Sequence, residues 1–155
     1  MSSSPDAALG VDFGTTNTVL ALERDGEAHL APFSHDGTPF NAFRSALSFH
    51  APDHDPTARQ VDAGPWAIDA YVEEPLETRF IQSFKSYAAS ALFTDTEILR
   101  RRFSFEDLLS AFLLKVKEHG GETLANLPRR VMVGRPVTFV GARPDTALQK
   151  APKDD

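Results

Sequence analysis

The sequence predicts an α/β fold in which a mixed sheet begins with an antiparallel meander and carries packed helices on its face. Two apolar runs around a glycine, residues 8–13 and 19–23, predict a pair of strands. Asp25-Gly26 is typical of a two-residue hairpin turn and predicts a third strand over 27–33. Apolar residues at helical spacing between 105 and 116 predict a long amphipathic helix.

Composition limits the classes of protein that fit. Of 155 residues, 41% are hydrophobic and 25% charged, so the chain can bury one globular core. The net charge of −6 disfavours a nucleic-acid surface, because phosphate binding needs clustered basic residues. The one basic run, Arg100-Arg101-Arg102, is expected at a solvated strand end. The chain has no cysteine, which excludes disulfides and Cys-ligated metals.

The sequence carries no pattern typical of a targeting or membrane segment. Residues 1–8 are polar and lack the basic start and apolar centre of a signal peptide. No stretch approaches the roughly 18 apolar residues that a membrane-spanning helix needs. We therefore expect a cytoplasmic protein with a flexible leader over residues 1–7 and no membrane partner.

The turn between the first two strands is the first candidate site. Gly14 allows a tight turn, and Thr15-Thr16-Asn17 offers successive N–H groups and hydroxyls that can form an anion-binding nest. Asp12 stands at the mouth of this nest, where a bound phosphate would repel it unless a cation lay between them. Acid and nest together indicate a Mg²⁺-nucleotide, with Asp12 holding the ion through water. A hairpin whose Asp and Thr residues only satisfy the turn fits the same pattern.

The stretch Gly10-Val11-Asp12-Phe13-Gly14-Thr15-Thr16-Asn17-Thr18 resembles the first phosphate motif of the actin-like ATPase superfamily, especially of the seventy-kilodalton heat-shock chaperones. The resemblance implies an actin-like ATPase (ribonuclease H-like) lobe over residues 8–148. It also implies ATP or ADP and Mg²⁺ as cofactors, bound at Asp12, Gly14, Thr15, Thr16 and Asn17. Sugar kinases of the same superfamily share this motif.

The next segments are expected to be short elements and loops. Residues 35–39 and 51–63 are predicted as loops, 45–49 as a strand similar to one in the chaperones, and 66–73 as a helix starting at Pro65. His50 and His54, beside Asp53 and Asp55, lie in a Pro-containing loop that does not set metal-ligand geometry, so we predict no metal site there. His29, His35 and His119 are too far apart in sequence to indicate a site.

Lys85 stands alone in an apolar and aromatic setting, residues 80–87. Taken by itself, such a lysine is usually a surface residue whose stem covers apolar neighbours. In the heat-shock chaperones an essential lysine follows the short helix at about this place, and the surroundings of Lys85 resemble the short bacterial branch of the family. The resemblance implies that Lys85 and Asp12 are catalytic, with the cation offsetting charge on the γ-phosphate and orienting the attacking water. Sugar kinases lack this lysine.

The long helix is predicted to begin at the capping residue Ser104, with acids in its first turn, and to stop at Gly120-Gly121. Its apolar face indicates packing, and it resembles the long helix of the chaperone fold. A strand over 128–136 follows and ends at Pro136. In the family a similar proline relays nucleotide state, but here we favour the simpler explanation that Pro ends a strand because it cannot donate a ladder hydrogen bond.

The resemblance covers one lobe, without the family's second phosphate motif, its adenosine motif or its substrate domain. Residues 149–155 are expected to be a polar tail of a truncated chain. The leading hypothesis is the ATP-binding lobe of a heat-shock-type stress-response chaperone, unable to hydrolyse ATP efficiently alone because half a cleft lacks closure. Its partners would be nucleotide, co-chaperones or a second chain that completes the cleft. The alternatives are a sugar-kinase-like fragment and a non-enzymatic interaction module.

Overall fold

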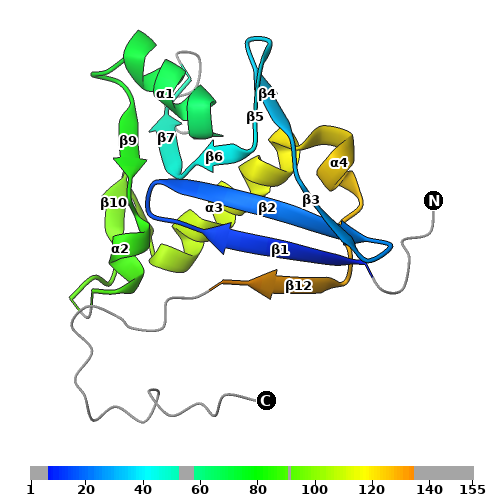
Figure 1. Ribbon diagram of the computed structural model, residues 1–155. Helices are drawn as coiled ribbons and strands as arrows, with labels where there is room; N and C mark the ends of the chain where they lie inside the picture. Colours follow the sequence, from blue (N-terminus) through cyan, green and yellow to red (C-terminus); the bar gives the residue numbers. More distant parts are fainter. Residues whose placement is uncertain (1–6, 53–57, 91, 135–155) are drawn as a thin grey trace, which may run out of the picture.

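A five-stranded mixed sheet, here called sheet A, forms the centre of the molecule (Figure 1). The computed structural model describes residues 7–52, 58–90 and 92–134. Sheet A has the order β12-β1-β2-β3, and β6 also pairs with β2. Its strands are β1 (Ala8–Phe13), β2 (Asn17–Arg24), β3 (Glu27–Leu30), β6 (Ala42–Arg44) and β12 (Arg130–Val133). Because β1 is antiparallel to β2 and parallel to β12, the prediction of an α/β fold with a mixed sheet is confirmed.

Two β-hairpins of the structure each have an Asp-Gly pair at the turn, and the first of them joins β2 to β3. Asp25-Gly26 has φ angles of 55° and 82° and joins β2 to β3, as predicted. The third strand was expected to run to residue 33, but β3 ends at Leu30. The N–H of Ala31 makes one more bond, to the carbonyl of Leu20 at 2.8 Å, and Pro32 has no N–H to continue.

The loop predicted over 35–39 is wrong, because these residues belong to a hairpin. Strand β4 (Phe33–His35) pairs with β5 (Thr38–Phe40). Asp36-Gly37, with φ angles of 47° and 75°, is the turn between them and repeats the Asp-Gly signal of the first hairpin.

A three-stranded sheet stands beside sheet A. It has the order β8-β7-β9, with β7 (Ala46–His50), β8 (Gln60–Ala63) and β9 (Arg79–Gln82). The strand predicted over 45–49 is confirmed within one residue. The loop predicted over 51–63 is wrong at its end, because its last four residues form β8 and pair with β7.

Helix α1 (Gly64–Glu73) packs against β7, and Pro65 lies in its first turn as predicted. Gly64 has a φ of +63°, a conformation that side chains rarely adopt. A Cβ at this position would also lie 2.5 Å from Cε1 of Phe43, which is fully buried. Gly64 is therefore required both by its backbone angle and by the space around it.

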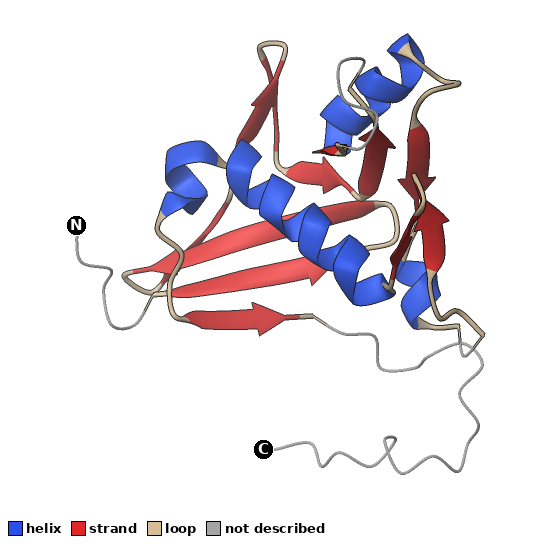
Figure 2. Ribbon diagram, turned by 180° about the vertical axis from the view of Figure 1, so that it is seen from behind, coloured by secondary structure: helices blue, strands red, loops and turns tan. Residues whose placement is uncertain are grey.

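Helix α3 (Phe105–His119) lies across one face of sheet A (Figure 2). The predicted cap is confirmed: the Asp107 N–H donates to Ser104 Oγ at 3.2 Å, and the Ser104 N–H donates to Asp107 Oδ2 at 3.0 Å. The predicted apolar face is only partly buried, since Leu108, Phe112 and Val116 lie in the core while Leu113 remains 36% exposed.

Four short elements complete the described chain. They are α2 (Lys85–Ala88), the hairpin of β10 (Thr96–Ile98) with β11 (Arg101–Phe103), and α4 (Gly121–Ala125), which follows α3 directly. None of the described helices has the length and apolar character needed to cross a membrane. Pro136, the tail over 149–155 and all but the last residue of the predicted leader lie outside the described residues.

We expect Gly64→Ala to lower the free energy of unfolding by about 2–4 kcal/mol, because a positive φ and a collision with Phe43 act together. Gly37→Ala is the matched control, since Gly37 also has a positive φ but nothing lies within 4 Å of the added Cβ. It should cost only about 1 kcal/mol. Urea unfolding followed by circular dichroism measures both values, and equal losses would contradict the proposed collision.

Candidate functional site

Asp12 lies near the carboxyl end of β1, on the face of sheet A opposite α3. Its neighbours Val11 and Phe13 are buried towards α3, so the alternation of the strand turns the Asp12 side chain outwards, where it is exposed. A Cβ built on Gly134, just after β12, would lie 3.7 Å from Asp12 Oδ1. The carboxylate therefore stands where two parallel strands end together, which is where sheets of α/β proteins bind ligands.

The turn after β1 is closed by its own backbone. The Gly14 N–H donates to the Asn17 carbonyl at 3.0 Å, and a Cβ on Gly14 would collide with that oxygen. Gly14 thus permits a close backbone approach, and its N–H is not free to bind an anion. Among the described residues, the N–H groups of Thr15 and Thr16 donate to no other group, and both residues are exposed.

Two contacts hold this turn in place. The Ser45 N–H donates to the Thr16 carbonyl at 2.9 Å. The hydroxyls of Thr18 and Ser45, both buried, lie 2.9 Å apart in a hydrogen bond. Ser45 therefore anchors the turn from the segment between β6 and β7, a role that no local sequence signal indicates.

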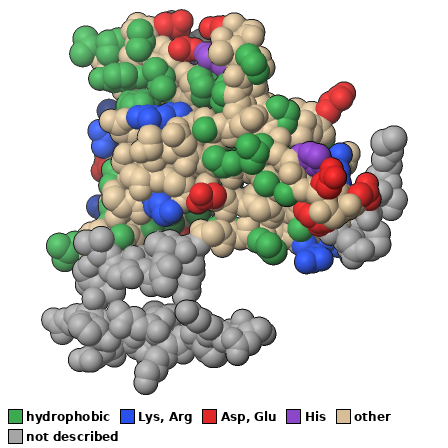
Figure 3. Space-filling view, in the orientation of Figure 1, with side chains coloured by type: hydrophobic (Ala, Val, Ile, Leu, Met, Phe, Trp, Pro, Cys, Tyr) green, Lys and Arg blue, Asp and Glu red, His purple; other side chains and the backbone are tan. Residues whose placement is uncertain are grey.

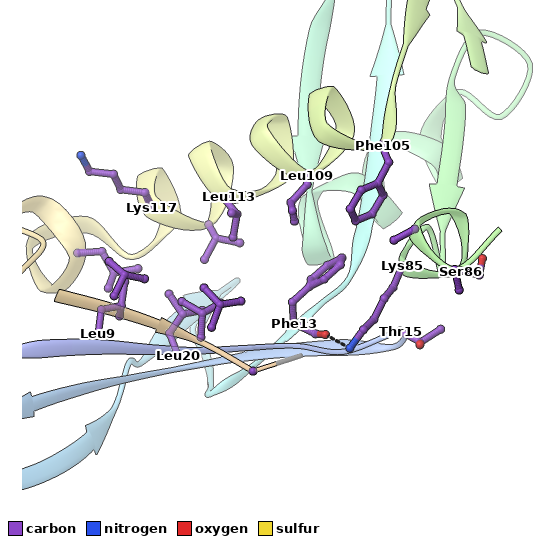
Figure 4. A pocket seen from close by; sticks show the side chains of 18 of the residues that line it. Leu9, Phe13, Thr15, Leu20, Lys85, Ser86, Phe105, Leu109, Leu113 and Lys117 are labelled. Carbon is purple, nitrogen blue, oxygen red and sulfur yellow. Dashed lines mark hydrogen bonds between the residues drawn. The ribbon is translucent and has the colours of Figure 1, made fainter. Parts of the chain in front are cut away.

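Lys85 reaches the same end of β1 from 72 residues away in the sequence. Phe84 is fully buried and packs on Phe13 with ring centroids 5.3 Å apart, which places the next residue, Lys85, beside β1. The Lys85 ammonium donates to the Phe13 carbonyl oxygen (Figure 4) and lies 5.7 Å from the Phe13 ring centroid. Within the described part of the chain no ion pair joins Lys85 to Asp12.

The exposed acidic side chains lie mainly away from the β1–β2 turn, so they do not repel an anion there. On the face shown in Figure 3, acidic side chains gather over α1 and over the β2–β3 turn, where Asp25 and Glu27 are exposed. Few lie near the β1–β2 turn. The end of β1 thus has an exposed carboxylate on one face of sheet A, two turn N–H groups without a partner among the described residues, and an ammonium that reaches the Phe13 carbonyl from the α3 side. Groups of these kinds bind phosphates and their cations.

Two of the histidines that are far apart in the sequence, His35 and His119, lie close together in the folded chain. His35 and His119 both contact Trp66, with ring centroids 4.6 Å and 3.5 Å away, and the His119 ring stacks on the indole. His35 Nε2 also lies 2.6 Å from Asp69 Oδ2. His29 stays apart, 3.6 Å from Glu27.

His54, Asp53 and Asp55 lie outside the described residues. Among the described residues, one group of histidine and acids is close enough to be considered as a metal site. His35, Asp36 and Asp69 place ligand atoms within 4.8 Å of one another. Both acids are exposed and His35 Nε2 already bonds to Asp69, so a His–Asp hydrogen bond accounts for the arrangement.

No protein-family model matches the chain. The assignment to the heat-shock chaperones therefore rests on the resemblance of the first strand, its turn and the surroundings of Lys85.

Burial lowers the pKa of His119 below its ordinary value of 6.5, because the charged ring would lose solvation. Glu118 and Asp62 oppose this shift, while Lys115 and His35 add to it. The folded state therefore binds a proton at His119 less readily than the unfolded state does. This contribution to stability is complete above pH 6.5 and is lost as the pH falls through 6.5 towards the lower folded pKa.

We expect the free energy of unfolding of His119→Gln to fall less than that of the wild type between about pH 7.5 and pH 5.5. Other titrating groups act equally in both proteins, so the difference isolates His119. Urea unfolding at several pH values measures it. His29→Gln, at a histidine whose side chain is 65% exposed, should keep the wild-type pH dependence. Identical curves for wild type and His119→Gln would show that the half-buried His119 ring is not responsible.

Proposed function

We propose that this chain is the ATP-binding lobe of a heat-shock-type chaperone ATPase of the cytoplasm, and that it binds the phosphates of a Mg²⁺-nucleotide at the carboxyl end of β1. The observation that carries the proposal is the position of Lys85. Its ammonium meets the carbonyl of Phe13, the residue between Asp12 and the Gly14 turn, although it comes from a distant part of the chain. The acid, the turn and the lysine thus surround one strand end.

The residues present fit such a ligand. The free N–H groups of Thr15 and Thr16 would donate to phosphate oxygens. One carboxylate, Asp12, is sufficient for Mg²⁺, because this ion keeps several waters and takes its other ligands from phosphates. An ammonium has three donors, so Lys85 can keep its bond to Phe13 and still donate to a phosphate.

In hydrolysis, ATP would supply the transferable phosphoryl group and Mg²⁺ would neutralise part of its charge. Lys85 would offset the charge that develops on this group and orient the attacking water. The described residues form only one wall around this position, since Thr15, Thr16 and Asn17 are exposed. Turnover would require a co-chaperone or a second chain to supply the opposite wall and exclude water.

A non-enzymatic interaction module is the second candidate, and the exposed apolar side chains of β12 favour it. Val131, Met132 and Val133 are between 51% and 64% exposed on an edge strand. In that case Asp12 and Lys85 would bind no nucleotide. Among the described residues, no polar cluster beside Asp12 and Lys85 favours the sugar-kinase alternative.

We expect Mg²⁺-ATP and Mg²⁺-ADP to bind weakly, with a Kd on the order of 1 mM or tighter, measured by calorimetry on the full chain. Lys85→Met should weaken binding about tenfold or more through the loss of a charge-assisted contact. Asp12→Asn should remove the difference between affinities measured with Mg²⁺ and with EDTA, because it removes the carboxylate that holds the ion.

Two control variants match these changes. Lys117→Met removes an ammonium at the far end of α3, and Asp25→Asn removes an exposed carboxylate from a turn that Asn tolerates. Both should bind nucleotide like the wild type. A folded protein whose melting temperature does not change with Mg²⁺-ATP would contradict the proposal and favour the interaction module.

A further inference from the structure

A polar pocket lies between α1 and the three-stranded sheet β8-β7-β9. Helix α1 packs on β7 at the top of Figure 1, and the pocket opens beside this contact with a volume of about 340 Å³. One wall carries Trp66, Asp69 and Glu73 of α1, and the other carries His50 of β7 and Asp62 of β8. We refer to this space as the α1 pocket. It shares no residue with the candidate nucleotide site.

The side of the three-stranded sheet that faces α1 carries polar side chains. Tyr71 of α1 stacks on Phe80 of β9 with ring centroids 5.0 Å apart, so α1 covers the face that includes Phe80. In the strand register, Phe80 and Asp62 both lie opposite Ser48. Because directly opposed residues point to the same face, Ser48 and Asp62 also face α1. His50 follows Ser48 by two residues along β7 and therefore points the same way.

Two buried polar atoms on this face have no hydrogen-bond partner among the described residues. They are Ser48 Oγ and His50 Nδ1. Ser48 is fully buried and lies directly opposite Asp62 and two residues before His50, both of which line the α1 pocket. Since nearly all buried polar groups in proteins are hydrogen-bonded, these two atoms favour a polar ligand in the pocket beside them.

The α1 pocket is strongly acidic, in keeping with the acidic side chains that Figure 3 shows over α1. Four carboxylates line it, on Asp62, Asp69, Glu73 and Glu74, and among the described residues no lysine or arginine does. Asp69 bonds to His35, whereas the other three form no ion pair within the described part of the chain. Asp62 is half-buried, and a carboxylate removed from water is stabilised by a cation beside it. The charge of the pocket therefore favours a cationic ligand.

The spacing of the acids favours an organic cation over a metal ion. Among the described residues, His35, Asp36 and Asp69 are the one group of three whose ligand atoms lie within 4.8 Å of one another. The other acids of the α1 pocket thus do not converge on one point. A guanidinium group is planar and has five N–H donors, so it can donate to carboxylates on two walls and to a ring nitrogen at once. An ammonium is a compact charge with three donors and reaches fewer of these acceptors.

We propose that the α1 pocket binds a guanidinium group of the kind that an arginine side chain carries. Asp62 on the sheet and the acids of α1 would pair with the charge from two sides, and His50 Nδ1 would accept one of its N–H groups. The proposal goes beyond nucleotide binding and does not depend on it. Its tests leave Asp12 and Lys85 unchanged, so either proposal can fail alone.

Calorimetric titration of the full chain near neutral pH tests the site, with N-acetyl-arginine amide as the probe. We expect a Kd on the order of 1 mM, and a Kd about five times higher for N-acetyl-lysine amide, which has the same charge. The fluorescence of Trp66, the only tryptophan in the chain, should change over the same range because this residue lines the pocket. Binding heat without a change in this fluorescence would place the ligand elsewhere and overturn the proposal.

Three variants and one control locate the contact. Asp62→Asn should weaken binding of the arginine probe about tenfold, since it removes the half-buried carboxylate. Glu73→Gln combined with Glu74→Gln should have a similar effect and changes only exposed side chains, so folding is not at risk. Glu77→Gln is the matched control, because Glu77 is also exposed and close in sequence but does not line the pocket. It should bind like the wild type.

His50→Phe separates a role in binding from a role in folding. It keeps an aromatic ring and removes the unpartnered Nδ1, so it should leave the free energy of unfolding unchanged or higher while weakening binding about threefold. Urea unfolding measures the first effect and calorimetry the second. Wild-type affinity in this variant would contradict the assigned contact.

Free arginine distinguishes the two sources of a guanidinium group. Tighter binding of N-acetyl-arginine amide than of free arginine assigns the pocket to an arginine within a polypeptide, and the reverse assigns it to the free amino acid. Either order supports a guanidinium site. No binding of the arginine probe at about 20 mM, equal binding of the arginine and lysine probes, or an equal loss in the Glu77→Gln control would each overturn the proposal.

Discussion

The contact between Phe13, Phe84 and Phe112 is the interaction on which the rest of the structure depends. Phe13 closes β1, Phe84 precedes α2 and Phe112 lies in the middle of α3, with ring centroids 5.3 Å to 5.8 Å apart. The cluster fastens the end of the first strand to both helices. Phe112 also packs on Phe43, which brings strand β6 of sheet A into the same core. The same aromatic packing therefore forms the core and fixes the position of the candidate site.

Strand β1 contributes side chains both to the hydrophobic core and to the candidate site. Because alternate side chains point to opposite faces, burying Val11 and Phe13 against α3 forces Asp12 outwards at the point where β1 and β12 end. Lys85 follows the buried Phe84, so its place beside β1 depends on aromatic packing and needs no ion pair with Asp12. A site built in this way rests on packed aromatic side chains on one side and is open on the other, where Thr15 and Thr16 are exposed.

The two faces of sheet A offer different surfaces. One face presents Asp12 beside the turn, where the geometry suits a phosphate and its cation. The other face carries α3, which covers part of the sheet and leaves an apolar groove with a lysine at each end. The two surfaces meet at the end of β1, because Lys85 lines the groove and also donates to the Phe13 carbonyl beside the turn.

The sequence by itself determined those helices, strands and turns that depend on residues close together in the chain. Ser104 and Asp107 cap α3, Asp25-Gly26 turns the first hairpin, and β1 and α1 follow the predicted bounds closely. The missed elements also had local causes: Asp36-Gly37 repeated the hairpin signal, and Pro32 ended β3 early. Only the tertiary structure decided that Lys85 meets β1, that His35 and His119 gather at Trp66, and that Leu113 is left uncovered. These arrangements depend on packing between segments far apart in the chain, which periodicity, capping and turn chemistry do not specify.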